Sequence, residues 1–285
     1  MYGLFESIIM IPFLLQLQKQ KIEFHKPIVM GILNLTTDSF YDGGKYLDTY
    51  VEQVAKMLQE GATIIDIGAM SSKPGSPIIT DEVEIQKLRE PLRILKQSFP
   101  EAIFSIDTVN SETAAFSLDQ GVDIINDISA AAIDSKMIQV VKQYPCTYIA
   151  MHMRGTPETM ISLNQYDNMV EEILDYFKSK IAFLESEGVK QIIPDIGFGF
   201  AKNIKQNFTL LKVLNKFLVL HKPLLVGISR KSMIYKTLSI NADQALNGTS
   251  ALHMLALQNG ASILRVHDVK EAMECIRLFE VYEQA

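Results

Sequence analysis

Charged and amide side chains recur at one kind of place in this sequence, the point where a short apolar run ends. Asp107, Asn126 and Asp195 each close such a run, and Arg265 and His267 alternate along the last one. Carboxylates and amides accept hydrogen bonds from an amino group beside a ring N–H, so the first three could hold the edge of an aminopyrimidinone ring. Hydrogen bonds among themselves, or caps on the following helices, are the alternative.

Arg265 and His267 share one face of their strand, because side chains two residues apart point to the same side. The planar fork of an arginine suits phosphate oxygens. If the first and last strands are neighbours, Asn34 lies beside this pair and the three predict a diphosphate site; His267 alone could be structural. Asn34 also opens an oxygen-rich loop, residues 34–44, which could face a metal or a phosphate or be an ordinary capped turn.

Two further segments carry polar groups. Residues 68–77 (GAMSSKPGSP) place hydroxyls and Lys73 among small residues and prolines, although a plain surface loop has the same composition. Residues 229–232 (SRKS) precede a helical run, where a hydroxyl and adjacent cations favour an anion such as a carboxylate, with an ordinary N-cap as the alternative. Ile128 and Met151 follow neighbouring strands and could contact the faces of a ring, although such a Met is more often core.

The elements that must position these groups form a βα pattern repeated eight times. Apolar runs cover residues 27–34, 60–68, 102–107, 120–128, 146–151, 187–196, 223–228 and 259–266. Stretches with apolar positions at helical spacing separate them. Continuous apolar strands indicate a parallel sheet covered on both faces, and eight units in about 260 residues predict a closed (β/α)₈ TIM barrel with its active site at the carboxyl ends of the strands. An open doubly wound sheet is the alternative.

Composition supports a soluble, folded, single-domain protein. The 285 residues are 48% hydrophobic and 21% charged, with a net charge of −6. The sequence has no run of basic residues, so we expect no nucleic-acid partner. Cys146 and Cys275 match no metal-ligand spacing, as expected of a reduced cytoplasmic protein. The apolar run at residues 7–15 is too short to span a membrane. We expect residues 1–24 to be an N-terminal extension or packing helix, and residues 25–285 to form the barrel domain.

Eight segments, taken in order, resemble the signature motifs of the dihydropteroate synthase family. They are NLTTDSFYDGG from residue 34, GAMSSKPG from 68, SIDT from 105, IINDIS from 124, MHMRG from 151, DIGFGFAK from 195, VGISRKS from 226 and RVHD from 265. The resemblance implies a (β/α)₈ barrel, usually a homodimer and a target of sulfonamides. It also implies a transferase that joins 6-hydroxymethyl-7,8-dihydropterin diphosphate to 4-aminobenzoate and releases diphosphate in folate biosynthesis.

The same resemblance implies a role for each matching residue. The pterin would be held by Asp107, Asn126, Asp195 and Lys231, with its faces against Ile128 and Met151. Mg²⁺ would be coordinated by Asn34, and the diphosphate would be held by Arg265 and His267. The aminobenzoate site would be formed by Ser72, Lys73, Pro74, Phe200 and Ser232. The catalytic groups would be Asn34, Lys231, Arg265 and His267.

Four positions depart from the common motifs: Thr37, Met70, Lys73 and Ile196. Lys73 stands where the family usually has Arg, and a point charge cannot reproduce bidentate or stacked contacts, so weaker aminobenzoate affinity or altered sulfonamide sensitivity is expected. Two rival functions remain. A pterin-dependent methyltransferase would not need the first loop or the SRKS segment, and a non-catalytic pterin-binding paralogue would be expected to lose Asn34, Lys231 or Arg265.

Overall fold

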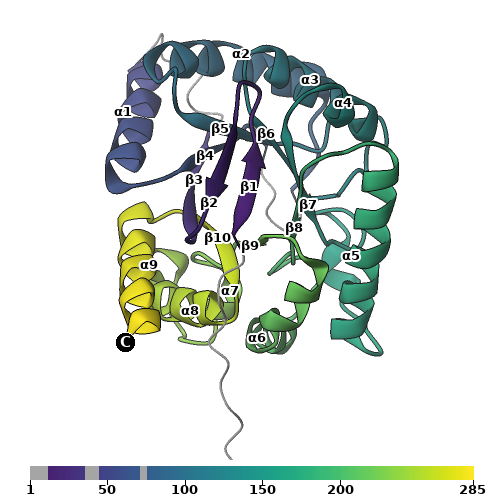
Figure 1. Ribbon diagram of the computed structural model, residues 1–285, viewed down its shortest axis with the longest axis vertical. Helices are drawn as coiled ribbons and strands as arrows, with labels where there is room; N and C mark the ends of the chain where they lie inside the picture. The colour runs from purple at the N-terminus through teal and green to yellow at the C-terminus, as the bar shows by residue number, and fades with distance from the viewer. Residues whose placement is uncertain (1–11, 36–44, 71–75) are drawn as a thin grey trace, which may run out of the picture.

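Eight parallel strands close into a barrel, in the order β10-β3-β4-β5-β6-β7-β8-β9 (Figure 1). The computed structural model describes residues 12–35, 45–70 and 76–285. The strands are β3 (Ile28–Asn34), β4 (Ile64–Gly68), β5 (Ile103–Asp107), β6 (Ile124–Asp127), β7 (Thr147–Met151), β8 (Ile192–Asp195), β9 (Leu224–Val226) and β10 (Ala261–Val266). The predicted (β/α)₈ barrel is therefore confirmed, and the open sheet is excluded.

Helices surround the barrel and cover the outward faces of its strands (Figure 1). They are α1 (Lys45–Glu60), α2 (Asp81–Ser98), α3 (Ser111–Asp119), α4 (Met137–Gln143), α5 (Met169–Ser186), α6 (Ile204–Lys212), α7 (Ser232–Tyr235), α8 (Leu246–Gln258) and α9 (Val269–Gln284). Short 3₁₀ turns lie at Met160–Ser162, Leu214–Leu220 and Ala242–Gln244. None of the described helices is long and apolar enough to cross a bilayer.

An antiparallel hairpin, β1 (Phe13–Gln16) and β2 (Lys21–Phe24), lies across one end of the barrel (Figure 1). Leu15 is fully buried and packs, with other hairpin residues, on a layer of aliphatic side chains that includes Ile64, Ile124 and Ile263. The hairpin backbone is also tied down, because Gln16 N–H donates to Thr147 Oγ1 over 3.0 Å. The described part of the N-terminal segment is thus a β-hairpin rather than a packing helix; residues 1–11 lie outside the described residues.

The alternation of side chains along each strand places polar groups directly above this aliphatic layer. Ile64 belongs to the layer, and Asp66, two residues on, is paired in register with Ser105 of the next strand. Asp107 is paired in the same way with Asn126. Because residues two apart face the same side of a strand, the barrel interior changes from apolar to polar toward its carboxyl end. The polar end is the mouth predicted from the sequence.

Candidate active site

Three buried acceptors predicted to bind a heterocycle lie together in the mouth. Asp107, Asn126 and Asp195 are 6%, 1% and 7% exposed. Asn126 is oriented by its amide nitrogen, which donates to Asp66 Oδ2 over 3.0 Å. Its amide oxygen is buried and accepts no hydrogen bond from the described residues. Since a buried acceptor without a donor is unfavourable, this oxygen is suited to a ligand N–H.

Arg265 connects two of the carboxylates in this layer. Its Nε donates to Asp66 Oδ2 over 2.7 Å, and its Nη2 donates to Asp107 Oδ2 over 2.6 Å. Burial raises the pKa of Asp107 to about 7, and the charge of Arg265 only partly opposes this rise. Burial would lower the pKa of Arg265, but the Asp66 and Asp107 carboxylates outweigh it and raise the pKa. Asp107, predicted to bind the pterin, and Arg265, predicted to bind the diphosphate, therefore form an ion pair with each other.

Asp66 is the buried residue that organises this cluster, and the sequence reasoning did not assign it a role. It is 0% exposed and accepts hydrogen bonds from both Arg265 and Asn126 through one oxygen. Its other oxygen has no partner among the described residues. The signal that could have found it is its position two residues from the end of β4, in register with the polar Ser105 of β5.

Asp195 and Lys231 form the opposite side of the mouth. The Asp195 carboxylate accepts the N–H of Gly197 over 2.7 Å, and burial raises its pKa, against the lowering effect of Lys231. Lys231 donates to the Phe198 carbonyl, and its Nζ lies 4.8 Å from the centre of the Phe200 ring. Burial lowers the pKa of Lys231 to about 8. Its ammonium therefore remains mostly charged near neutral pH.

His267 lies at the rim, beside the last strand. Its Nδ1 is 3.1 Å from Ser229 Oγ, and its backbone N–H donates to the same hydroxyl over 3.2 Å. Desolvation and the nearby Arg265 charge lower the pKa of His267 to about 4, so the imidazole is neutral at physiological pH. Asn34 ends β3, is exposed, and its Oδ1 lies over Gly68 of the adjacent strand.

A small apolar cluster lines the mouth beside these polar groups. It contains Ile128, Met151 and Phe200, together with Met160, and Met70 packs against it. Of the predicted aminobenzoate residues, Phe200 and Ser232 are described, and Ser232 opens the four-residue helix α7. Three predicted residues, Ser72, Lys73 and Pro74, lie outside the described residues, as does Thr37, a further departure from the family motifs.

Arg230, the other cation of the SRKS segment, does not share this cluster. Its guanidinium donates to both carboxylate oxygens of Asp268 over 2.8 Å and to the carbonyls of Ala242 and Asp243. Its backbone has a φ of +53°, in the left-handed region. Arg230 therefore ties the turn after β9 to the segment after β10, a structural contact rather than an anion site.

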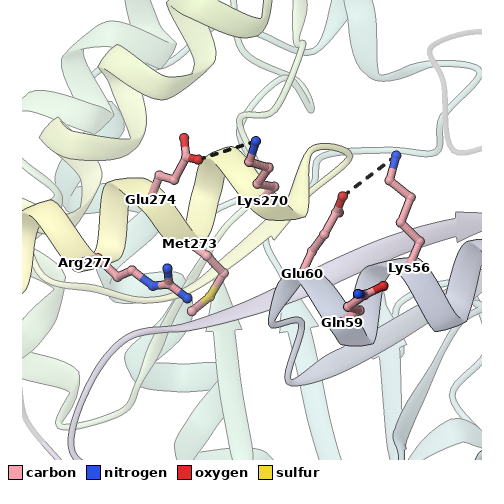
Figure 2. Close-up of a pocket in the computed structure, with 7 residues that line it drawn as sticks. All are labelled: Lys56, Gln59, Glu60, Lys270, Met273, Glu274 and Arg277. Carbon is pink, nitrogen blue, oxygen red and sulfur yellow. Dashed lines mark ion pairs between the residues drawn. The ribbon is translucent and has the colours of Figure 1, made fainter.

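A surface groove between α1 and α9 lies outside the predicted site. It has a volume of about 460 Å³ and is lined by Lys56, Gln59, Glu60, Lys270, Met273, Glu274 and Arg277 (Figure 2). Lys56 pairs with Glu60 over 3.8 Å, and Lys270 pairs with Glu274 over 3.9 Å. Each ion pair joins two residues of the same helix, so neither pair bridges the groove. The polar residues of the barrel mouth remain the candidate site.

Comparison with known proteins agrees with this geometry. The pterin-binding enzyme family matches residues 30–267, which include every described site residue. The dihydropteroate synthase of Escherichia coli is 38% identical over 267 residues, covering 92% of this chain and 94% of the relative. The chain belongs to the dihydropteroate synthase family. The transferase class and the role in folate biosynthesis predicted from the motifs are confirmed at this level.

Solved structures of the family share the whole barrel. The Yersinia pestis dihydropteroate synthase, solved with a sulfonamide drug complex, has a TM-score of 0.89 and 34% identity, and covers 96% of this chain and 100% of that chain. The Thermus thermophilus dihydropteroate synthase in complex with 4-aminobenzoate has a TM-score of 0.84 and 30% identity, and covers 94% of this chain and 99% of that one. 4-Aminobenzoate is therefore a ligand of that relative.

Proposed function

We propose that this protein catalyses the Mg²⁺-dependent condensation of 6-hydroxymethyl-7,8-dihydropterin diphosphate with 4-aminobenzoate, giving 7,8-dihydropteroate and diphosphate. One observation carries the proposal. Buried acceptors for an aminopyrimidinone edge lie in the same mouth as Arg265, a cation suited to a diphosphate that bonds to Asp66 and Asp107, above an aliphatic layer closed by the hairpin. The two halves of a pterin diphosphate thus have complementary groups in one mouth.

The pterin ring is assigned to the buried acceptors. The Asp195 carboxylate can accept two parallel hydrogen bonds from an amino group and the adjacent ring N–H. The unpartnered oxygen of Asn126 can accept a further one, and Asp107 lies one strand away. Lys231 would donate to the ring on its other edge, while Ile128 and Met151 would contact its faces.

The diphosphate is assigned to the groups at the rim of the mouth. Arg265 would supply positive charge, and neutral His267 would donate one hydrogen bond. Asn34 fits a Mg²⁺ ligand, because it is an exposed amide at the mouth, and Mg²⁺ keeps several waters and binds proteins through few oxygens plus substrate phosphates. No group of three metal-ligating His, Cys, Asp or Glu side chains occurs among the described residues.

The aminobenzoate is assigned to the apolar side of the mouth. Phe200 offers a ring face, Ser232 can bind a carboxylate, and Ser72, Lys73 and Pro74 would complete the site from the second loop. Mg²⁺, when bound, would neutralise charge developing on the departing diphosphate. Arg265 and His267 would hold the leaving oxygens, and the pterin acceptors would orient the methylene carbon toward the incoming amine. This displacement requires no protein nucleophile. Burial raises the pKa of the Cys146 thiol to about 12, so this cysteine is not a reactive thiolate near neutral pH.

The proposed assembly is a homodimer in the cytoplasm. Leu255 of α8 and Leu278, Val281 and Tyr282 of α9 are 46%, 65%, 68% and 63% exposed, on two helices that pack against each other. An exposed apolar face of this kind favours a protein interface. Sedimentation of the wild type and of Leu278→Glu would test the dimer. Two buried free cysteines favour a reducing compartment.

Diphosphate release by purified protein, with and without 4-aminobenzoate, tests the function. We expect release to require the amine and Mg²⁺, with dihydropteroate formed in equal amount. Asp195→Ala should abolish turnover, whereas Asp175→Ala, in an exposed pair with Lys178, should not change it. Tight pterin binding without amine-dependent turnover would contradict the proposal and favour a pterin-binding paralogue or a methyltransferase.

A further inference from the structure

The loop between β8 and α6, residues 196–202, has an unusual backbone. Gly197, Gly199 and Ala201 have φ values of +73°, +85° and +50°, all in the left-handed region. A Cβ on Gly197 would lie 2.1 Å from the His152 carbonyl oxygen, so the loop packs tightly on the end of β7. A left-handed Ala is unfavourable by about 1–2 kcal/mol. Other contacts must therefore hold this loop in place.

Lys202 supplies those contacts from a buried position, with only 8% of its surface exposed. Its Nζ donates to the Gly197 carbonyl over 2.9 Å and to the Phe200 carbonyl over 3.0 Å. It lies 3.1 Å from His152 Nδ1 and 3.4 Å from the His152 carbonyl oxygen. These partners are carbonyls and an imidazole rather than a carboxylate. The Lys202 amino group therefore links Gly197 and Phe200 of the loop to His152, the residue that follows β7.

His152 and Asn207 complete the arrangement from two sides. Burial, Lys202 and Arg154 lower the pKa of His152 to about 2, so its ring is neutral and Nδ1 can accept a hydrogen bond from Lys202. Asn207 is 2% exposed; its Oδ1 accepts the Gly199 N–H over 2.7 Å, and its Nδ2 donates to the Lys202 carbonyl over 3.1 Å. Lys202 and Asn207 together therefore hold the loop backbone at Gly197, Gly199, Phe200 and Lys202.

The loop in turn positions two groups of the mouth. The Phe198 carbonyl accepts a hydrogen bond from Lys231, and the Phe200 ring lies beneath the same ammonium. Lys231 and Asp195 are also held from outside the loop. The Lys231 N–H donates to the Ile228 carbonyl, and the Asp195 backbone is paired with Met151, although the Asp195 carboxylate also accepts the Gly197 N–H. Displacing the loop should therefore move Phe200, which belongs to it, more than Lys231 or Asp195.

We propose that Lys202 is a positioning residue for the aminobenzoate side of the site, holding the 196–202 loop so that Phe200 presents its ring to the amine. The inference rests on the proposed function, and it concerns a residue that does not itself touch substrate. Its consequence is asymmetric: loss of the Lys202 amino group should impair binding of the amine more than binding of the pterin.

The test compares Lys202→Met with Lys205→Met, a change at an exposed lysine of α6. Michaelis constants are measured for both substrates, with calorimetric titration of the dihydropterin diphosphate in Mg²⁺. We expect Lys202→Met to raise the KM for 4-aminobenzoate about 10-fold or more, because small misplacements of binding groups are costly, and to change pterin affinity less than about 3-fold. Lys205→Met should match the wild type in both.

Asn207→Ala provides a second variant, because it frees the same loop without altering Lys202. It should raise the KM for 4-aminobenzoate more than it changes the affinity for the pterin substrate. It provides the test of the inference if Lys202→Met does not fold. Equal effects on both substrates, or no effect, in a folded variant would overturn the inference alone. A wild type without amine-dependent turnover would overturn the proposed function and the inference with it.

Discussion

Arg265 bridges two buried carboxylates, so replacing it with a neutral side chain should destabilise the fold by an amount that depends on pH. Its side chain is 18% exposed, and those of Asp66 and Asp107 are 0% and 8% exposed. Arg265→Met keeps the apolar stem but leaves both carboxylates without their cation. Breaking a buried pair in this way costs about 3–5 kcal/mol of unfolding free energy, which we expect above neutral pH.

The sign of the pH dependence follows from Asp107. Burial raises its folded-state pKa to about 7 from an ordinary value of 3.8, so its contribution to stability is complete below the ordinary value and is lost as pH rises through about 7. Arg265 lowers this pKa. Without Arg265 the folded-state pKa of Asp107 rises further, so the loss of stability continues to higher pH. The penalty of Arg265→Met should therefore grow by about 1.4 kcal/mol per pH unit just above neutrality and shrink in mild acid.

Urea unfolding at several pH values measures this penalty. The chain has no Trp, so far-ultraviolet circular dichroism is the suitable signal. Arg93→Met is the matched control, because Arg93 pairs with Glu90 on the exposed face of α2 and should contribute little at any pH. The reasoning is refuted if the two variants lose similar stability, or if the loss in Arg265→Met is the same in acid as above neutrality.

Three further predictions concern the loop, the hairpin and the second loop. Gly197→Ala should lower the melting temperature well beyond Gly188→Ala. An added Cβ at Gly188 meets nothing within 4 Å, so Ala there carries only the backbone penalty of about 1–2 kcal/mol. Equal melting temperatures of the two variants would contradict this. Leu15→Ala, at a fully buried site, should cost about 2–5 kcal/mol by urea unfolding and leave both KM values unchanged. Lys73→Arg should strengthen aminobenzoate or sulfonamide binding in a titration, and no change in either would count against a role for Lys73.

The barrel and the described residues of its mouth could be predicted because each strand, and the polar residue that ends it, can be recognised within a short stretch of sequence. Each apolar run is continuous along the sequence, and a residue such as Asp107 or Asp195 ends its run visibly. Closure of the sheet then brings Asn34 and Arg265 onto neighbouring strands without further information. The side chains assigned to one site therefore follow from topology alone.

Pairing within the mouth could not be predicted in the same way. Arg265 binds Asp66 and Asp107 because its side chain reaches them across the barrel. The spacing of these residues along the sequence does not encode that reach. The Lys202 contacts depend on a left-handed loop whose conformation is decided by packing on β7. The hairpin was missed because an apolar run with period-two burial and one with helical burial look alike when only a few residues long.

The hairpin that closes the barrel also constrains the order in which the chain can fold. Gln16 bonds to Thr147, 131 residues away, and Gln18 bonds to Leu118 and Asp123, 100 and 105 residues away. Its apolar face rests on Ile263 of the last strand as well. During synthesis, Phe13 and Leu15 therefore have no complete docking surface until the final strand emerges. The hairpin contacts are therefore non-local ones, of the kind that form late in folding because the loops they close are long.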